Sequence, residues 1–375
     1  MVWGLTMNVK RAFFIIAFGL CSASGLMAKV QPDRPLHGTW DFKPRVEWKV
    51  DGAGKAGKEA LQYGTLLVDE QGQIWYLDLV ARRVHLFSAQ GSWMRSFGRT
   101  GKGPGDLDGP WSLFMVGEDL AVNESERVSF FSQEGRFRAS ERMLVQGLQA
   151  FGCVGGQRLA CRTNFNSEPV NGKETVGIFD PATTRFQKLI DFPAQEYIQK
   201  ENFAFQARSV QPGPVVSCDG QRVVCGFSGT YAIHVFGADG GKITTIEMDR
   251  KRPPISLAER EELVNGSSFV KNTGLSTAKV AYMLPSTYTH FNRLFADPGG
   301  AILVQCPHAQ SARMARLDLF GPQGTYLYRA MLRLPVEGEI VTHAIAPGRW
   351  VVIVEDDAGD IYLLHCSLNW PTQWA

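Results

Sequence analysis

The sequence predicts an all-β protein, a six-bladed β-propeller of four-stranded antiparallel blades, because one structural unit recurs along its 375 residues. Residues 64–111 hold four apolar runs, each about one strand long, followed by a glycine-rich connector. A connector of this kind is expected where the outer strand of one blade crosses to the inner strand of the next. The third run and its turn recur as VHLFSAQG at 84–91, VSFFSQEG at 128–135, IHVFGADG at 233–240, LDLFGPQG at 317–324 and, more loosely, GIFDPAT at 177–183.

The repeats define a propeller over residues 64–368, between an N-terminal segment at 29–63 and a C-terminal tail at 369–375. The sixth unit has only three apolar runs. We expect the isolated apolar run at 46–50 to supply its fourth strand, because this pairing closes the ring and covers an exposed sheet edge. The six blades are expected to begin near Gly64, Trp111, Leu148, Gly213, Phe291 and Ile340.

One short helical insertion, at 249–290, interrupts the repeats. Ser256 followed by Glu259 forms a capping box, which predicts a surface helix over 257–264. Two interpretations of residues 267–289 stay open: a plain link between blades, or a lid over the channel.

Large aromatic residues occupy equivalent positions in several units. Because they recur with the repeat, we expect them to pack between blades and not to form a binding stripe. These residues are Trp75, Phe87, Phe131, Phe236 and Phe320.

The N-terminus has the pattern of a signal peptide, assigned to residues 1–28. Lys10 and Arg11 precede an apolar run at 12–20, and small residues follow up to Ala28. The apolar stretch is shorter than the ~20 residues of a spanning helix, so no membrane span is expected after cleavage. A periplasmic or secreted protein is predicted.

Charge is nearly balanced, with 39 Lys and Arg against 37 Asp and Glu, a net charge of +2. A nucleic-acid partner is not expected, because a nucleic-acid groove must neutralise many phosphates. The expected partner is a protein or a small-molecule ligand, and the chain is expected to be a monomer.

Six cysteines follow the signal segment, an even number that favours disulfides in an exported protein. Cys153 and Cys161 flank one Gly-Gln-Arg turn, and Cys218 and Cys225 flank another. We therefore predict the disulfides Cys153–Cys161 and Cys218–Cys225, with buried free thiols as the alternative.

Two stretches resemble known propeller sequences. FGRTGKGPGDLDGPWSLFMV at 97–116 resembles the NHL-type repeat, and LPSTYTHFNRLFADPGGAILV at 284–304 resembles a late blade of the exported bacterial six-bladed β-propellers. The resemblance implies a scaffold that binds a protein or a small ligand. Relatives of this architecture include lyases and lactonases that hold a metal in the central channel, so fold alone does not choose the function.

The residues themselves form no complete catalytic constellation. Only His290 and His343 fall near expected inner strands, and Glu339 is the nearest carboxylate by position. No cofactor is predicted. Enzyme activity stays open, with a binding scaffold favoured over a channel-sited, metal-dependent lyase or lactonase-type hydrolase.

Any ligand is expected at the channel mouth where the connectors between blades gather. Propellers assemble a polar site there from residues that are distant in sequence. The predicted ligand-binding residues are Lys102, Asp106, Trp111, Arg208, His290, Asn292, Arg293 and His343.

Overall fold

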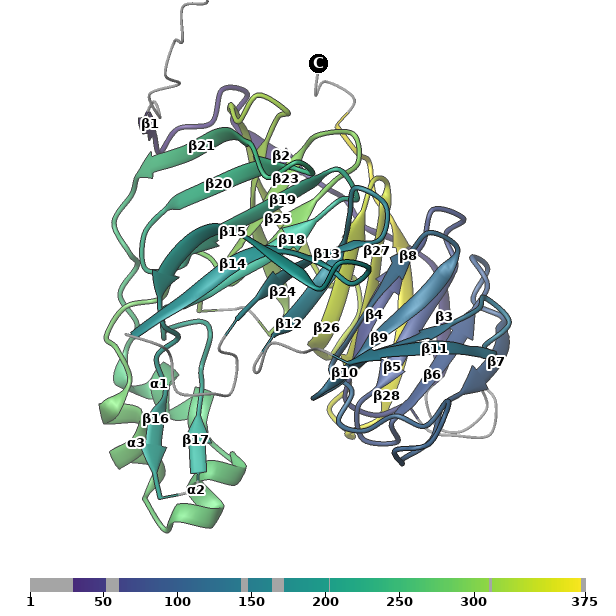
Figure 1. The fold of residues 1–375 in the computed structure, drawn as a ribbon. Helices are drawn as coiled ribbons and strands as arrows, with labels where there is room; N and C mark the ends of the chain where they lie inside the picture. Colours follow the sequence, from purple (N-terminus) through teal and green to yellow (C-terminus); the bar gives the residue numbers. More distant parts are fainter. Residues whose placement is uncertain are drawn as a thin grey trace, which may run out of the picture.

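The computed structural model describes residues 30–51, 61–142, 148–163, 172–201, 203–309 and 312–371. Six four-stranded antiparallel blades are arranged in a ring, which confirms the predicted six-bladed β-propeller (Figure 1). The assigned signal peptide lies outside the described residues. Within the described part of the chain, no helix is long and apolar enough to cross a bilayer.

Each blade is a meander that runs from an inner to an outer strand. Blade 1 is β4 (Gly64–Val68), β5 (Ile74–Asp78), β6 (Arg83–Phe87) and β7 (Trp93–Phe97). Blade 2 is β8 (Ser112–Val116), β9 (Asp119–Asn123), β10 (Arg127–Phe131) and β11 (Phe137–Arg142). Blade 3 is β12 (Gln149–Val154), β13 (Arg158–Arg162), β14 (Lys173–Asp180) and β15 (Arg185–Pro193).

The remaining blades follow the same order. Blade 4 is β18 (Pro214–Cys218), β19 (Arg222–Phe227), β20 (Ala232–Gly237) and β21 (Lys242–Asp249). Blade 5 is β22 (Arg293–Ala296), β23 (Ile302–Cys306), β24 (Met314–Phe320) and β25 (Tyr326–Arg333). Blade 6 is β26 (Glu339–Ala346), β27 (Arg349–Glu355), β28 (Ile361–Ser367) and β3 (Arg45–Asp51). All six inner strands begin within two residues of the expected blade starts.

The recurring third-strand pattern encodes one type of hairpin. In four blades its glycine is the fourth residue of a turn. The backbone N–H of this glycine donates to the backbone oxygen of the first turn residue at 2.8–2.9 Å, and the glycine has a φ of +77° to +86°. In each case the strand register also shifts at the end of the third strand, just before the turn. A turn ending in a left-handed residue beside a bulge needs glycine, which explains why the glycine repeats. These glycines are Gly91, Gly135, Gly240 and Gly324.

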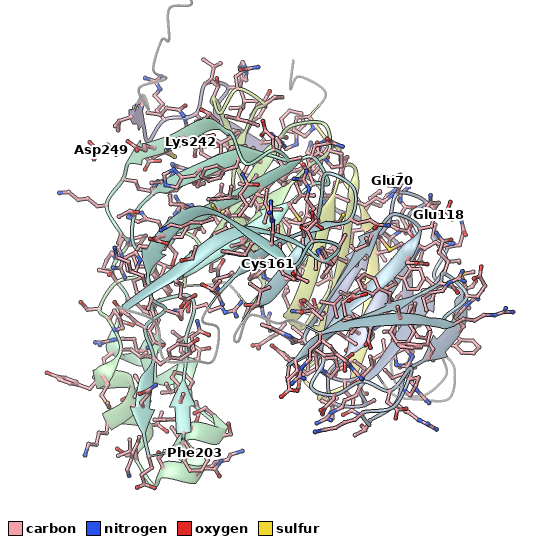
Figure 2. All side chains as sticks on the ribbon, viewed as in Figure 1. Glu70, Glu118, Cys161, Phe203, Lys242 and Asp249 are labelled. Atoms are coloured by element: carbon pink, nitrogen blue, oxygen red, sulfur yellow. The ribbon has the colours of Figure 1, made fainter. Side chains whose placement is uncertain are left out.

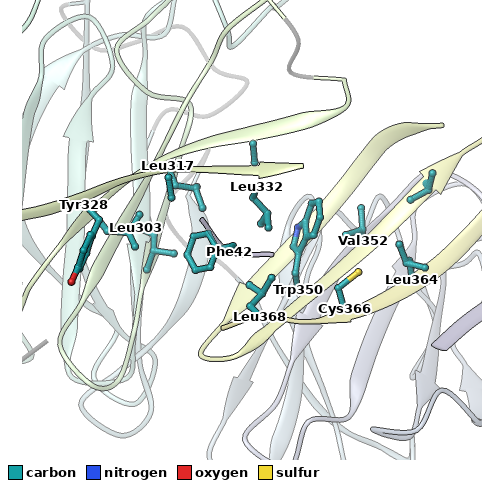
Figure 3. Close-up of a cluster of buried hydrophobic side chains, with 14 of the residues drawn as sticks. Phe42, Leu303, Leu317, Tyr328, Leu332, Trp350, Val352, Leu364, Cys366 and Leu368 are labelled. Atoms are coloured by element: carbon teal, nitrogen blue, oxygen red, sulfur yellow. The ribbon is translucent and has the colours of Figure 1, made fainter. Parts of the chain in front are cut away.

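The core consists of apolar layers between neighbouring blades. Phe131 of blade 2 packs with Trp75 of blade 1, and Phe320 of blade 5 packs in a cluster with Ile233 of blade 4. The layer between blades 5 and 6 is built around Phe42 and Trp350 (Figure 3). All five recurring aromatics are buried, as predicted. Burial of this kind supplies most of the favourable energy of folding.

The N-terminal segment closes the ring. Strand β3 pairs antiparallel with β28, with Val50 opposite Leu363, as the isolated run at 46–50 predicts. Two short strands were not predicted: β1 (Val30–Pro32) and β2 (Thr39–Asp41) pair in parallel with the outer strands β21 and β25. The segment therefore covers the edges of three consecutive blades.

The insertion between β21 and β22 holds three helices, α1 (Leu257–Val264), α2 (Ser268–Thr273) and α3 (Thr277–Met283). Ser256 and Glu259 form the predicted capping box at α1. An unpredicted hairpin, β16 (Ile198–Lys200) and β17 (Phe203–Phe205), lies beside the helices below the ring (Figure 1). A separate hydrophobic cluster that includes Ile198, Val264 and Val280 joins the two parts.

The two predicted disulfides are not formed: all six cysteines are free thiols. In blade 3, Cys153 stands opposite Leu159 and Cys161 opposite Ala150. In blade 4, Cys218 stands opposite Val223, two positions short of Cys225. Each predicted pair is therefore out of register across its hairpin, which the spacing alone did not reveal.

Candidate functional site

The central channel has one cavity at each end. The connector-end cavity, about 260 Å³ in volume, is lined by the starts of inner strands and by the connector between blades 3 and 4. The hairpin-end cavity, about 490 Å³, is lined by the opposite ends of the inner strands and their turns. Phe151 and Phe295 line both cavities, so their rings lie between the two. Figure 2 shows that Glu70, on a turn at the hairpin end, lies far from Phe203, which belongs to the β16–β17 hairpin on the connector side.

Half of the predicted ligand-binding residues come together in the connector-end cavity. Arg208 arrives from the connector between blades 3 and 4, Asn292 and Arg293 from the start of blade 5, and His343 from the inner strand of blade 6. They share the cavity with Arg162, at the end of β13. Three blades and one connector therefore contribute side chains to one polar site.

His343 is fixed by two hydrogen bonds. The indole N–H of Trp350 donates to its Nδ1 at 3.1 Å, and its Nε2 lies 2.8 Å from Oε1 of Gln305. Because an indole can only donate, Nδ1 is the acceptor and the proton resides on Nε2. Burial, and then the charge of Arg293, lower the pKa of His343 well below its usual value. A neutral His343 with both nitrogens engaged is a wall of the cavity and not a free ligand for a metal.

Three guanidinium groups gather at this cavity. Arg293 donates to the backbone oxygen of His343 at 3.2 Å and to Oγ1 of Thr342 at 3.4 Å, both neutral acceptors. Burial, and then the charge of Arg208, lower the pKa of Arg293. Arg208 is exposed, and among the described residues its guanidinium has no hydrogen-bond or ion-pair partner.

Only one of the three arginines has a carboxylate partner. Arg162 is buried, and its Nε lies 3.1 Å from Oε2 of Glu174. It also donates to the backbone oxygen of Pro214 at 2.9 Å and to Oε1 of Gln149 at 3.0 Å. Burial raises the pKa of Glu174, although the charge of Arg162 opposes the rise. Among the described residues that line the cavity, none is Asp or Glu.

Three other predicted residues, Lys102, Asp106 and Trp111, belong to the connector between blades 1 and 2 and do not line this cavity. Asp106 pairs with Arg99 at 2.6 Å, and the backbone oxygens of Lys102 and Asp106 accept from Arg127. The indole N–H of Trp111 donates to the backbone oxygen of Glu124 at 3.3 Å. The polar groups of this connector are thus engaged within the connector or with blade 2.

The eighth predicted residue, His290, is buried behind the cavity. Its ring contacts the ring of Tyr231, with centroids 5.8 Å apart. Burial, followed by the charges of Arg252 and Arg250, lowers its pKa to about 4. His290 is therefore neutral near pH 7 and lies in the core between blades 4 and 5.

The helical insertion lies beside the connector-end cavity. The lining residues include none from 250–291, and α1, α2 and α3 pack instead against the β16–β17 hairpin. Arg252 ties the insertion to the propeller by donating to the backbone oxygens of Tyr288 and Val210 at 2.8 and 3.3 Å. In this structure, residues 267–289 are an elaboration between blades and not a lid over the cavity.

The hairpin-end cavity has a different character. Its walls combine apolar side chains such as Leu67, Met115 and Ile345 with three carboxylates, Glu70, Asp219 and Asp297. Cys153 and Cys218 also line it, from neighbouring blades. Among the described residues, no three His, Cys, Asp or Glu side chains come together in a geometry that could hold a metal ion at either end.

Sequence reasoning missed several residues of the connector-end cavity. Arg162 lies at the end of a second strand, and Gln195 and Gln211 flank the unpredicted β16–β17 hairpin. The amide nitrogen of Gln195 donates to the backbone oxygen of Pro212 at 2.9 Å, which fixes the base of the connector. The only available signal was the long, irregular segment between blades 3 and 4.

Comparison with known proteins supports the fold and goes no further. No family model matches the chain, and no curated protein matches it in sequence. Among solved structures, a Bacteroides fragilis protein thought to be exported aligns over 90% of this chain and 100% of its own, with a TM-score of 0.53 and 11% identity. A Bacteroides vulgatus member of the DUF4221 family aligns over 88% and 99%, with a TM-score of 0.52 and 8% identity. At such identities the likeness defines a six-bladed β-propeller alone.

Proposed function

We propose that this propeller is a binding protein that holds a small ligand in the connector-end cavity. The observation that carries the proposal is the convergence of Arg208, Asn292, Arg293 and His343 on one concave site from different segments. A volume of about 260 Å³ suits a small molecule better than a protein surface. Partly apolar walls with a few fixed polar groups are typical of ligand sites.

A thermal-shift screen against small metabolites tests this function. Thr65 lines the cavity from the first inner strand, so Thr65→Trp should fill the cavity without removing a charged group. Ser140→Trp is the matched control, because it adds the same ring on the exposed outer strand of blade 2. We expect a stabilising ligand whose effect is lost in Thr65→Trp and kept in Ser140→Trp. Ligands that stabilise both variants equally would contradict the proposed site.

We also propose that the protein is exported. The basic pair Lys10 and Arg11 before the apolar run at 12–20 supports export. Fractionation of cells that express the full chain with a C-terminal tag should recover a shortened product in the periplasm or the medium. Recovery of the full-length product in the cytoplasm alone would contradict export.

A further inference from the structure

The connector-end cavity carries an excess of positive charge. Arg162, Arg208 and Arg293 all line it, whereas the chain as a whole has a net charge of only +2. Glu174 pairs with Arg162 and offsets one charge. The contacts of Arg293 are neutral oxygens, and Arg208 has no partner among the described residues. Among the described residues, neither of these two guanidinium groups has a carboxylate within ion-pair distance, although the charge of Glu174 also acts on Arg208 from farther away.

The surroundings keep these charges in place without neutralising them. The backbone oxygen of His343 and Oγ1 of Thr342 orient Arg293 from β26, and the packing of β22 fixes its stem. Like charges near each other in a partly dry site repel, and a bound anion removes that repulsion. Arginine also suits this task, because its planar group donates two parallel hydrogen bonds to a carboxylate or a phosphate.

We infer that the connector-end cavity binds a compact anion, with a carboxylate or phosphate group held between Arg208 and Arg293. This inference rests on the proposed small-ligand function and gives the ligand its chemical class. Arg162, already paired with Glu174, adds no net charge to the wall of the cavity.

Titration calorimetry on the purified protein tests the inference with defined compounds. The anions are malate, which has a hydroxyl next to a carboxylate, succinate, which lacks the hydroxyl, and inorganic phosphate; the neutral comparison is succinamide. We expect malate or phosphate to bind, with an affinity that falls as salt rises, and succinamide not to bind. Comparison of malate with phosphate then separates the two anionic groups, and comparison of malate with succinate measures what a hydroxyl next to the carboxylate contributes.

Three variants locate the anion. Arg208→Met keeps the side-chain stem, and because Arg208 is exposed the variant should fold normally. We expect Arg208→Met and Arg293→Met each to weaken binding at least about tenfold, the loss of one charge-assisted contact. Arg138→Met, which removes an exposed arginine on the outer strand of blade 2, is the matched control and should bind as the unmodified protein does.

Each outcome decides between the two proposals. Binding of malate or phosphate that is weakened in Arg208→Met but unchanged in Arg138→Met supports the anion. If none of the three anions binds at millimolar concentration, or if they bind equally to Arg208→Met, the anion inference is overturned. A neutral compound that loses its effect in Thr65→Trp and keeps it in Arg208→Met would preserve the small-ligand site while overturning the anion.

Discussion

Asp318 is the side chain whose removal should destabilise this propeller most clearly. It is fully buried in β24 and accepts hydrogen bonds from Tyr326 at 2.6 Å, Tyr231 at 2.8 Å and Arg250 at 2.5 Å. Arg250 also pairs with Asp33, next to β1. The carboxylate thus joins blades 4 and 5 to the N-terminal segment.

We expect Asp318→Ala to lower the free energy of unfolding by about 3–5 kcal/mol, because it leaves a buried guanidinium short of its partner. Two buried tyrosine hydroxyls also lose their acceptor, at about 1–3 kcal/mol for each donor left unpaired, although such costs do not simply add. Asp318→Asn keeps one acceptor oxygen and should fall between Asp318→Ala and the unmodified protein. Asp357→Ala is the control, because Asp357 is 86% exposed and should change stability by less than about 1 kcal/mol.

Urea unfolding followed by tryptophan fluorescence measures these differences. An effect of Asp318→Ala below about 1 kcal/mol, equal to that of Asp357→Ala, would refute the reasoning.

Acid provides a second test. Burial tends to raise the pKa of Asp318, but Arg250 and the two tyrosines outweigh it, so the folded-state pKa is lowered. The ionised Asp318 therefore contributes to the free energy of unfolding above the unfolded-state pKa of about 4, and this contribution is lost as pH falls through the folded-state pKa. Asp318→Asn should not show this loss.

Three further predictions concern the hairpin glycines, a buried histidine and the closing strand. Gly135→Ala should destabilise more than Gly117→Ala, because both have a positive φ but only at Gly135 would the added Cβ lie 2.5 Å from a phenyl ring; urea unfolding compares them. His290, whose pKa is lowered to about 4 chiefly by burial, should make stability fall as pH drops from about 6.5 to 4, and His290→Gln should reduce the slope by about one proton. Trp48→Ala should cost on the order of 2 kcal/mol in thermal unfolding, because Trp48 in β3 donates to the backbone oxygen of Ala89 in blade 1 at 3.0 Å.

The sequence was informative about the fold wherever a local pattern specifies a local geometry. The turn glycines such as Gly91 and Gly135 recur because the hairpin needs a left-handed residue, so the repeat located the blades. The closing strand was predictable because blade 6 lacked an edge partner. Strands β1 and β2 were not, since three-residue strands show no periodicity and exist only through their pairing with β21 and β25.

The candidate site was predictable only in part, because connectors differ in how they fold after leaving a strand. Arg293 and His343 sit on inner strands, whose position in a propeller follows from the repeat. Lys102 and Asp106 lie on a connector that binds its own charges through Arg99 and Arg127, which no spacing rule reveals. The prediction of two disulfides was wrong for a similar reason, because disulfide pairing depends on the strand register as well as on the separation along the chain.

The two ends of the channel can serve different chemistry because aromatic rings lie between them. Phe151 and Phe295 border both cavities, and they separate the arginines at the connector end from the carboxylates at the hairpin end. The inner strands that carry Arg293 and His343 are held by packed layers between blades, and the backbone oxygen of His343 orients the guanidinium of Arg293 before a ligand arrives. Binding at the connector end should therefore need little rearrangement of the backbone. Because less free energy is spent on ordering the site, even a small ligand can bind there with useful affinity.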